Sequence, residues 1–304
     1  MLNRYDHAGV VWVDLESPTE EEVRRLMEEY HLDPLIAEEL LIPSVKPKVE
    51  AHPGYIYLIL HFPAFKHTHG SESNQEVDFI VGERFLITAR YDTVDPLHKF
   101  AKVFEVHSLL AKGEPVPHGG MLLVQMLRKL YRAVEHELDF LRDEFADTER
   151  QVFAGREREM VVTLSKESRV LLDFKQALAM HGSVLESLEQ SAGSRFDLTF
   201  PYHVRSVIGL HRRLAQEIGG VLDALQELRD TNNALLSAKQ NEIMKAIAVM
   251  AFSMLPLTVI TQVFSMNTVA LPIIGNPFDF WIVIGIMLIS TTLFIGYFKH
   301  RGWL

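Results

Sequence analysis

The sequence predicts an α+β cytoplasmic domain in α/β/α layers, followed by long helices and a two-helix C-terminal transmembrane hairpin. Three observations predict this fold class. Strand-like and helix-like segments alternate through residues 1–112, and a helical period then runs almost unbroken from Met121. Residues 246–264 and 280–298 are apolar and carry no charged side chain. Each run is about nineteen residues long, close to the length that crosses roughly 30 Å of hydrocarbon as a helix.

The first elements of the α+β domain have clear start signals. Val10–Leu15 is a short apolar run that predicts a strand. A helix follows, with Ser17 as its cap and Pro18 at its first helical position. Asp33 and the proline after it open a second helix, Leu35–Leu41.

A hairpin and a further helix complete the domain. Tyr55–Phe62 is rich in aromatic and branched residues, which favours a strand. Glu76–Val81 and Arg84–Ala89 flank a two-residue Gly-Glu turn, the pattern of a β-hairpin. Asp95–Leu110 has its apolar residues at helical spacing. We therefore expect a sheet covered by helices.

Long helices follow a short linker. Residues 113–120 are dense in Gly and Pro and predict a connection. Residues 121–190 keep a helical period with one interruption near Gly155, which predicts two long antiparallel helices. Pro201 opens a last helix with no strong breaker before Phe264, on the order of 90 Å at 1.5 Å per residue. This stalk continues into the first apolar run.

Composition excludes several classes of function. The formal net charge of −10 argues against nucleic-acid binding, because phosphate contacts need clustered Lys and Arg. The chain has no cysteine, so thiolate metal sites and thiol catalysis are excluded. No phosphate-binding loop, nucleophile elbow or metalloprotease helix is present in the sequence, and we expect neither an enzyme nor a bound cofactor.

Basic residues orient the hairpin. Lys239 and Lys245 precede the first apolar run, and Lys299 and Arg301 follow the second, whereas the loop 265–279 has neither Lys nor Arg. By the positive-inside rule, both chain ends are then cytoplasmic in a cell inner membrane. A signal peptide does not fit, because the runs are C-terminal. The alternative is a buried soluble hairpin, for which two such runs back to back are unusual.

Small, apolar and weakly polar side chains follow one side of the first apolar helix. Such a stripe suits a narrow pore for a hydrated cation, because magnesium dehydrates reluctantly and usually keeps several waters. It equally suits helix-on-helix packing in a membrane. Spacing alone leaves both interpretations open. The stripe consists of Asn241, Met244, Ala248, Ala251, Leu255, Thr258 and Gln262.

The residues after the first apolar run are Ser265-Met266-Asn267, and the chain ends in a basic segment followed by Trp303-Leu304. In these motifs the sequence resembles the CorA family of divalent-cation transporters, whose signature is Gly-Met-Asn. The resemblance extends to Lys46–Glu50 and covers nearly the whole chain. It implies a CorA-like homo-oligomeric funnel, a homopentamer in the lipid bilayer with the first span lining its axis.

The resemblance also implies roles for individual residues. Ser265, Met266 and Asn267 would form the selectivity filter, with the Asn267 amides contacting the hydrated ion at the outer mouth. The alternative role of Asn267 is a helix cap. If the family glycine has a positive φ, Ser265 would be strained there by about 1–2 kcal/mol. Asp230 would lie at the cytoplasmic pore entrance, or else be an ordinary solvated acid.

Regulation by cytoplasmic metal would use acids between neighbouring subunits. The possible regulatory residues here are Asp92 and Asp95, and the matching stalk position falls on Ser206, which is not an acid. His61, together with His67 and His69, resembles a transition-metal site, but an exposed loop without a metal is the favoured interpretation.

The resemblance implies transport of Mg²⁺ first, with Co²⁺, Ni²⁺ or Zn²⁺ as further transported or regulatory ions. A zinc-transporting branch, proton-coupled, is the alternative within the family. A membrane-anchored scaffold or sensor without transport is the alternative outside it. The expected parts are a 1–112 α/β domain, 113–198 long antiparallel helices, a 199–264 stalk and first span, a 265–279 outer loop, a 280–298 second span and a 299–304 basic tail.

Overall fold

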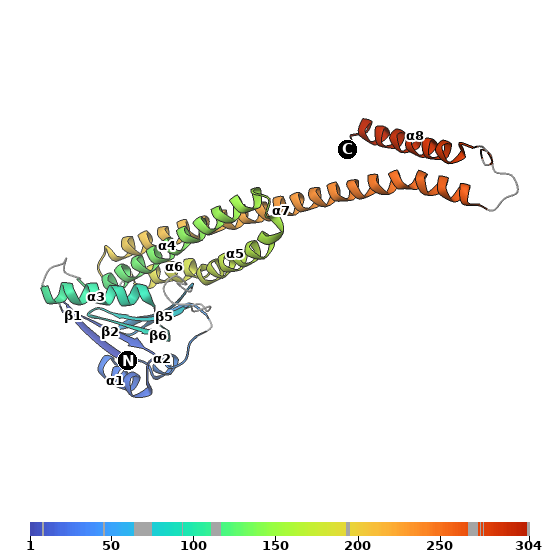
Figure 1. Ribbon diagram of the computed structural model, residues 1–304. Helices are drawn as coiled ribbons and strands as arrows, with labels where there is room; N and C mark the ends of the chain where they lie inside the picture. Colours follow the sequence, from blue (N-terminus) through green and yellow to red (C-terminus); the bar gives the residue numbers. More distant parts are fainter. Residues whose placement is uncertain are drawn as a thin grey trace. The chain divides into compact units, whose positions relative to one another are not determined.

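The computed structural model describes residues 1–7, 9–44, 46–63, 75–92, 94–110, 117–192, 195–266, 273, 275 and 277–302 (Figure 1). The chain divides into two compact units, Met1–Arg229 and Asp230–Leu304.

The first unit contains a six-stranded sheet in the order β1-β2-β6-β5-β4-β3. Only the β2–β6 pairing is parallel among the described pairs, and β5 and β6 form the hairpin expected from the sequence. The strands are β1 (Leu2–His7), β2 (Val10–Glu16), β3 (Lys48–His52), β4 (Tyr55–Phe62), β5 (Gln75–Gly82) and β6 (Phe85–Arg90).

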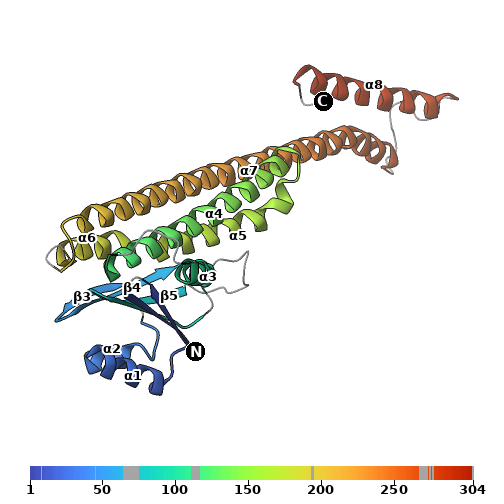
Figure 2. The same cartoon turned by 90° about the vertical axis from the view of Figure 1, so that its left-hand side faces the viewer.

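Helices cover both faces of this sheet. Successive side chains of a strand point to opposite faces, so Trp12 of β2 enters one core and Val13 the other. Figures 1 and 2 show α1 and α2 on one face and α3 and α4 on the other, the expected α/β/α layers. The helices are α1 (Glu20–Tyr30), α2 (Pro34–Glu39), α3 (Asp95–Leu110), α4 (Gly119–Phe153), α5 (Glu157–Leu178), α6 (His181–Ala192), α7 (Phe200–Ser265) and α8 (Asp279–His300).

The first helix begins two residues later than the sequence predicts. Thr19, not Ser17, is the N-cap of α1, and it forms a capping box with Glu22. Ser17 has a φ of 48° and donates its hydroxyl to the Tyr91 carbonyl at 3.3 Å. The second cap is as expected, because Asp33 accepts from the Leu35 amide at 2.9 Å.

The helical layer has three helices where two were predicted. The chain turns after α4 near Gly155, as expected, but it also breaks between α5 and α6. That break sets His181 at the start of α6, where it is fully buried.

His181 joins three elements of the first unit. Its Nε2 donates to the His61 carbonyl of β4 at 2.9 Å, so its Nδ1 is the acceptor for the Tyr131 hydroxyl of α4 at 2.8 Å. Burial, together with the nearby His211 ring, lowers the pKa of His181 to about 3. The imidazole is therefore neutral at physiological pH.

The start of α4 is fixed to the β5–β6 turn. The Gly119 amide donates to the Glu83 carbonyl at 2.8 Å. A methyl group at Gly119 would collide with the backbone oxygens of Gly82 and Phe85. Only glycine therefore allows this close approach of helix and hairpin.

A buried ion pair lies at the end of the parallel strand pair. Arg90 of β6 and Asp14 of β2 are 2% and 3% exposed at their side chains, with 3.1 Å between Nη2 and Oδ2. Thr88 donates to the other carboxylate oxygen of Asp14 at 2.7 Å. Both charges are thus paired and hydrogen-bonded, as burial requires.

Candidate functional site

Two helices of the second unit are long and apolar enough to cross a membrane, by length and composition. They are α8 and the C-terminal part of α7. Only 6% of the most apolar window of α7 and none of that of α8 is buried. A core helix of a soluble protein would be mostly buried, so the soluble-hairpin alternative loses its support.

One side of α7 is covered within the chain. Val249 is 7% exposed, as is Phe298 of α8, and the rings of Phe252 and Phe298 lie 6.0 Å apart. Further along α7 the half-buried residues recur at three and four positions, which defines a covered face. They are Ser253, Pro256, Leu257, Ile260 and Phe264.

The predicted pore-lining stripe lies on the other side of α7. At 3.6 residues per turn, its members fall roughly opposite the covered face. Leu255 is 55% and Met244 59% exposed, and only Ala248 of the stripe is half-buried. Packing within the chain therefore does not account for the stripe, which is available to neighbouring molecules or to water.

Hydroxyl groups on α7 already have acceptors for their protons. Thr258, on the stripe, donates to the Met254 carbonyl at 3.0 Å, and Thr261 donates to the Leu257 carbonyl at 2.8 Å. Each oxygen keeps lone pairs that can accept hydrogen bonds from water. The stripe can thus bind the water shell of a cation through neutral oxygens.

The signature residues begin where α7 ends. Ser265 is its last residue and donates its hydroxyl to the Gln262 carbonyl at 2.9 Å. Its φ is not positive, so the strain expected for serine in place of glycine does not arise. Met266 is 56% exposed. Asn267 lies outside the described residues.

The predicted acidic sites are distributed over both units. Asp230 is exposed on the part of α7 that belongs to the second unit. Asp92, just after β6, and Ser206, on the earlier part of α7, are exposed in the first unit. Asp95 begins α3, and its side chain lies outside the described part of the chain. Among the described residues, no group of three His, Cys, Asp or Glu side chains could hold a metal ion.

His61 is not in an exposed loop, which corrects that interpretation. It belongs to β4, its side chain is 14% exposed, and its Nε2 lies 3.1 Å from Glu76 Oε2. Burial alone would lower the pKa of His61, but the contact with Glu76 raises it. His67 and His69 lie outside the described residues.

The polar cluster that contains His61, Glu76 and Asp78 was not predicted from the sequence. Asp78 of β5 is 1% exposed and accepts from the hydroxyls of Tyr57 at 3.1 Å and Tyr91 at 3.3 Å. Burial raises the pKa of Asp78, and the neighbouring Glu76 carboxylate raises it further. The two acids Glu76 and Asp78, within a predicted strand that is buried along its length, are the signal that could have found the cluster.

A family model described as "CorA-like Mg2+ transporter protein" matches residues 7–300. The cobalt/magnesium transport protein CorA of Methanocaldococcus jannaschii is 23% identical over 306 residues, which cover 99% of this chain and 93% of the relative.

Two solved structures are also similar. The CorA magnesium transporter from Methanocaldococcus jannaschii has a TM-score of 0.87 at 21% identity, covering 97% of this chain and 92% of that one. The ZntB cytoplasmic domain from Vibrio parahaemolyticus has a TM-score of 0.63 at 14% identity, covering 75% and 88%. At these identities the structures establish a shared fold.

Proposed function

Because the chain belongs to the CorA-like Mg²⁺ transporter family, we propose that it carries divalent cations, magnesium first, across a membrane. The observation that carries this proposal is the stripe from Asn241 to Gln262, which is uncharged and lies opposite the covered face of α7. Lipid can cover the apolar residues of such a face, but its amide and hydroxyl groups favour neighbouring helices or water.

One hairpin cannot enclose a passage, so several copies surround a common axis. Each copy turns its stripe toward that axis, and the Thr258 and Gln262 oxygens form successive neutral rings. Magnesium keeps several waters when bound, and such rings accept hydrogen bonds from those waters. We take the number of copies as five, from the family resemblance.

The ends of the passage follow from the same arrangement. Ser265, Met266 and Asn267 form the filter at the outer mouth, and Asp230 forms an acidic ring at the inner end. The basic residues beside both spans keep the chain termini in the cytoplasm. Asp92 and Asp95 remain candidates for a regulatory metal, without an acid at Ser206 to complete the pair.

Transport of zinc, coupled to protons, is the second candidate. Ser265 in place of glycine and a loop whose only acid is Asp279 favour it. With fewer acids in the outer loop, any divalent ion is attracted to the outer mouth less strongly. The choice between magnesium and zinc then depends on the filter residues.

Flux into proteoliposomes tests both candidates. The wild type should take up Mg²⁺ under an inside-negative potential, and Asn267→Ala should reduce that uptake. Zinc uptake that follows a proton gradient, without magnesium uptake, would establish the second candidate instead. The absence of any flux of Mg²⁺, Zn²⁺, Co²⁺ or Ni²⁺ would leave a scaffold or sensor.

The orientation of α7 has its own test, because the chain has no cysteine. Leu255→Cys and Leu257→Cys are a matched pair on opposite faces. A membrane-impermeant thiol reagent needs the thiolate, which forms in water and not in lipid. We expect Leu255→Cys to react at least about tenfold faster and to lose flux on modification. Equal rates at both positions would contradict a stripe that faces the passage.

A further inference from the structure

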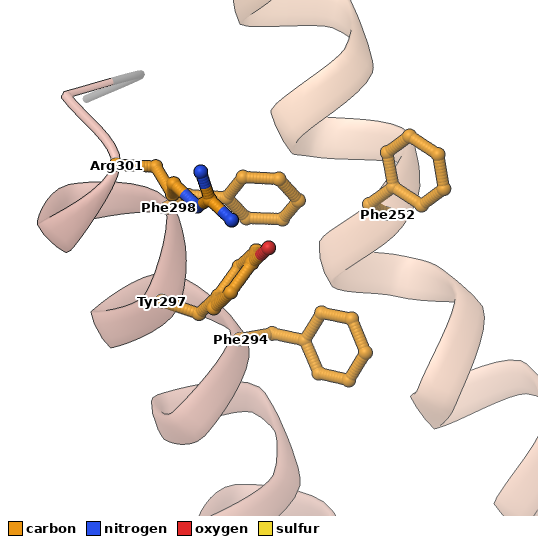
Figure 3. Close-up of a pocket in the computed structure, with 5 residues that line it drawn as sticks. All are labelled: Phe252, Phe294, Tyr297, Phe298 and Arg301. Carbon is orange, nitrogen blue, oxygen red and sulfur yellow. The ribbon is translucent and has the colours of Figure 1, made fainter.

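A cavity lies between α7 and α8 near the C-terminal end of α8. Its volume is about 390 Å³, within the range of about 300–1,000 Å³ that is usual for small-molecule sites. Figure 3 shows Phe294 and Phe298 pointing from α8 toward α7. The lining residues are Phe252, Phe294, Tyr297, Phe298 and Arg301.

The walls and the rim of this cavity differ in chemistry. Three phenylalanine rings make the walls, with centroids of Phe294 and Phe298 6.4 Å apart. At the rim the Arg301 guanidinium lies 5.8 Å from the centre of the Tyr297 ring. None of the carboxylates that the structure describes is within ion-pair distance of Arg301. Within the described residues, the cavity thus combines an apolar interior with a guanidinium that pairs with no carboxylate.

The position of the cavity along α8 places it at the boundary between the hydrocarbon and the headgroups of a membrane. The apolar run of α8 ends at Phe298, and Lys299, His300 and Arg301 follow at once. Tyrosine and arginine at the end of a span lie at the level of the lipid headgroups. A ligand there has hydrocarbon on one side and phosphate groups on the other.

We propose that this cavity binds an anionic phospholipid, with an acyl chain against the three phenylalanines and the phosphate on Arg301. Guanidinium matches phosphate oxygens with two parallel hydrogen bonds, which gives a geometry that a point charge lacks. Basic pockets between membrane helices are known to recognise such headgroups. The proposal requires only that α8 crosses a membrane, so it stands or falls separately from the transport of any ion.

A headgroup with net negative charge fits better than a zwitterionic one. A choline group would bring a positive charge beside the Arg301 guanidinium at the rim and near Lys299, which lies just outside the lining. Phosphatidylglycerol adds no such charge. The site should therefore prefer phosphatidylglycerol to phosphatidylcholine with the same chains.

Lipid titration of the purified full-length protein, followed by native mass spectrometry, tests the proposal. Arg301→Gln should weaken phosphatidylglycerol binding about thirtyfold, which corresponds to a charge-assisted hydrogen bond of about 2 kcal/mol. It should change phosphatidylcholine binding less than about twofold. Lys299→Gln is the matched control, because it removes one positive charge at a residue just outside the lining. General attraction to an anionic surface predicts that it weakens phosphatidylglycerol binding no more than about fivefold.

A second pair of variants tests the apolar wall. Phe294→Ala removes one wall, and Phe280→Ala removes an exposed phenylalanine at the other end of α8. Only Phe294→Ala should weaken phosphatidylglycerol binding. Both proteins should keep the wild-type elution volume, which shows that the assembly survives the change.

Three results would overturn the proposal. Equal losses of phosphatidylglycerol binding in Arg301→Gln and Lys299→Gln would mean that positive charge near the membrane surface attracts the lipid without a specific site at Arg301. Competition by glycerol 3-phosphate as strong as that by the lipid would mean a simple anion site. A disulfide between copies of Phe294→Cys, with no preference among lipids, would mean that a second copy of the chain fills the cavity.

Discussion

The buried His181 should make the first unit sensitive to acid, and glutamine in its place should remove that sensitivity. Protonation would put a positive charge among Tyr131, His211 and the His61 carbonyl, where His181 is fully buried. The folded state therefore resists protonation, whereas the unfolded chain does not.

The size of the effect follows from the two pKa values. The pKa of His181 is about 3 in the folded protein and 6.5 in a free histidine. Because the folded pKa is the lower one, the stability from the neutral imidazole is present above pH 6.5 and is lost as the pH falls. At 1.36 kcal/mol per pH unit, about 2 kcal/mol is lost by about pH 5.

Glutamine at position 181 should change both the free energy of unfolding at neutral pH and its dependence on pH. It keeps an amide donor for the His61 carbonyl, but it leaves the Tyr131 hydroxyl without its acceptor at Nδ1. At about pH 7.5, His181→Gln should be less stable than the wild type by about 1–3 kcal/mol. By about pH 5 this difference should shrink by about 2 kcal/mol, since glutamine does not titrate.

Urea unfolding followed by Trp12 fluorescence measures these free energies. Trp12 is fully buried and donates to Thr88 at 3.0 Å, so its emission reports the first unit. Trp281 and Trp303 are replaced by phenylalanine in every protein compared. His136→Gln, at an exposed histidine of α4, is the control and should keep the wild-type acid loss. If His181→Gln loses as much stability in acid as this control, the reasoning is refuted.

Three further predictions concern the first unit, and the same urea titration checks each. The raised pKa of Asp78 means that its stability contribution is fully present below pH 3.8 and is lost as the pH rises through the folded value. Asp78→Asn should therefore gain stability relative to the wild type as the pH rises, and parallel profiles would count against this. Arg90→Met should lower the free energy of unfolding by about 3–5 kcal/mol, because it leaves the buried Asp14 unpaired. Adding Asp14→Leu to this variant should restore most of that free energy, and no recovery would contradict the pairing argument. Gly119→Ala should lower the free energy of unfolding by about 1–3 kcal/mol and speed hydrogen exchange at the start of α4. An unchanged urea midpoint would show that the contact between Gly119 and the β5–β6 turn has room for a methyl group.

The strands with apolar runs were predictable, and the edge strands were not. β4, β5 and β6 are central and buried on both faces, so their sequences are strongly apolar. β1 and β3 are at the two ends of the sheet, with sequences LNRYDH and KVEAH. Charged and polar residues are usual on edge strands, and they hide the alternation that predicts a strand.

Buried polar contacts were the least predictable feature. Tyr131 and His181 are fifty residues apart, and no local pattern links them. The break between α5 and α6, which sets His181 in place, has no proline to mark it. His61 falls within the strand predicted for Tyr55–Phe62, next to an expected exposed loop, but no local pattern predicts its contact with Glu76.

The spacing predicted that the stripe residues share one side of α7, but not which side of α7 its own chain covers. The period of α7 alone could not separate a pore lining from helix packing. The covered positions around Val249 lie on the side away from Leu255, so the stripe does not pack within its own chain, and its role as a pore lining stays a prediction. The proposed passage would need several copies of the chain, so the sequence of one copy does not locate its axis.

The joint between Gly119 and the β5–β6 turn has a practical consequence for protein engineering. Hairpin turns are commonly chosen to receive fluorescent proteins or epitope tags, because exposed loop tips tolerate insertions. The Gly82–Glu83 turn looks suitable in the sequence, but its Glu83 carbonyl holds the first amide of a 35-residue helix. An insertion there would break this hydrogen bond and displace the start of α4, so labels belong elsewhere on the molecule.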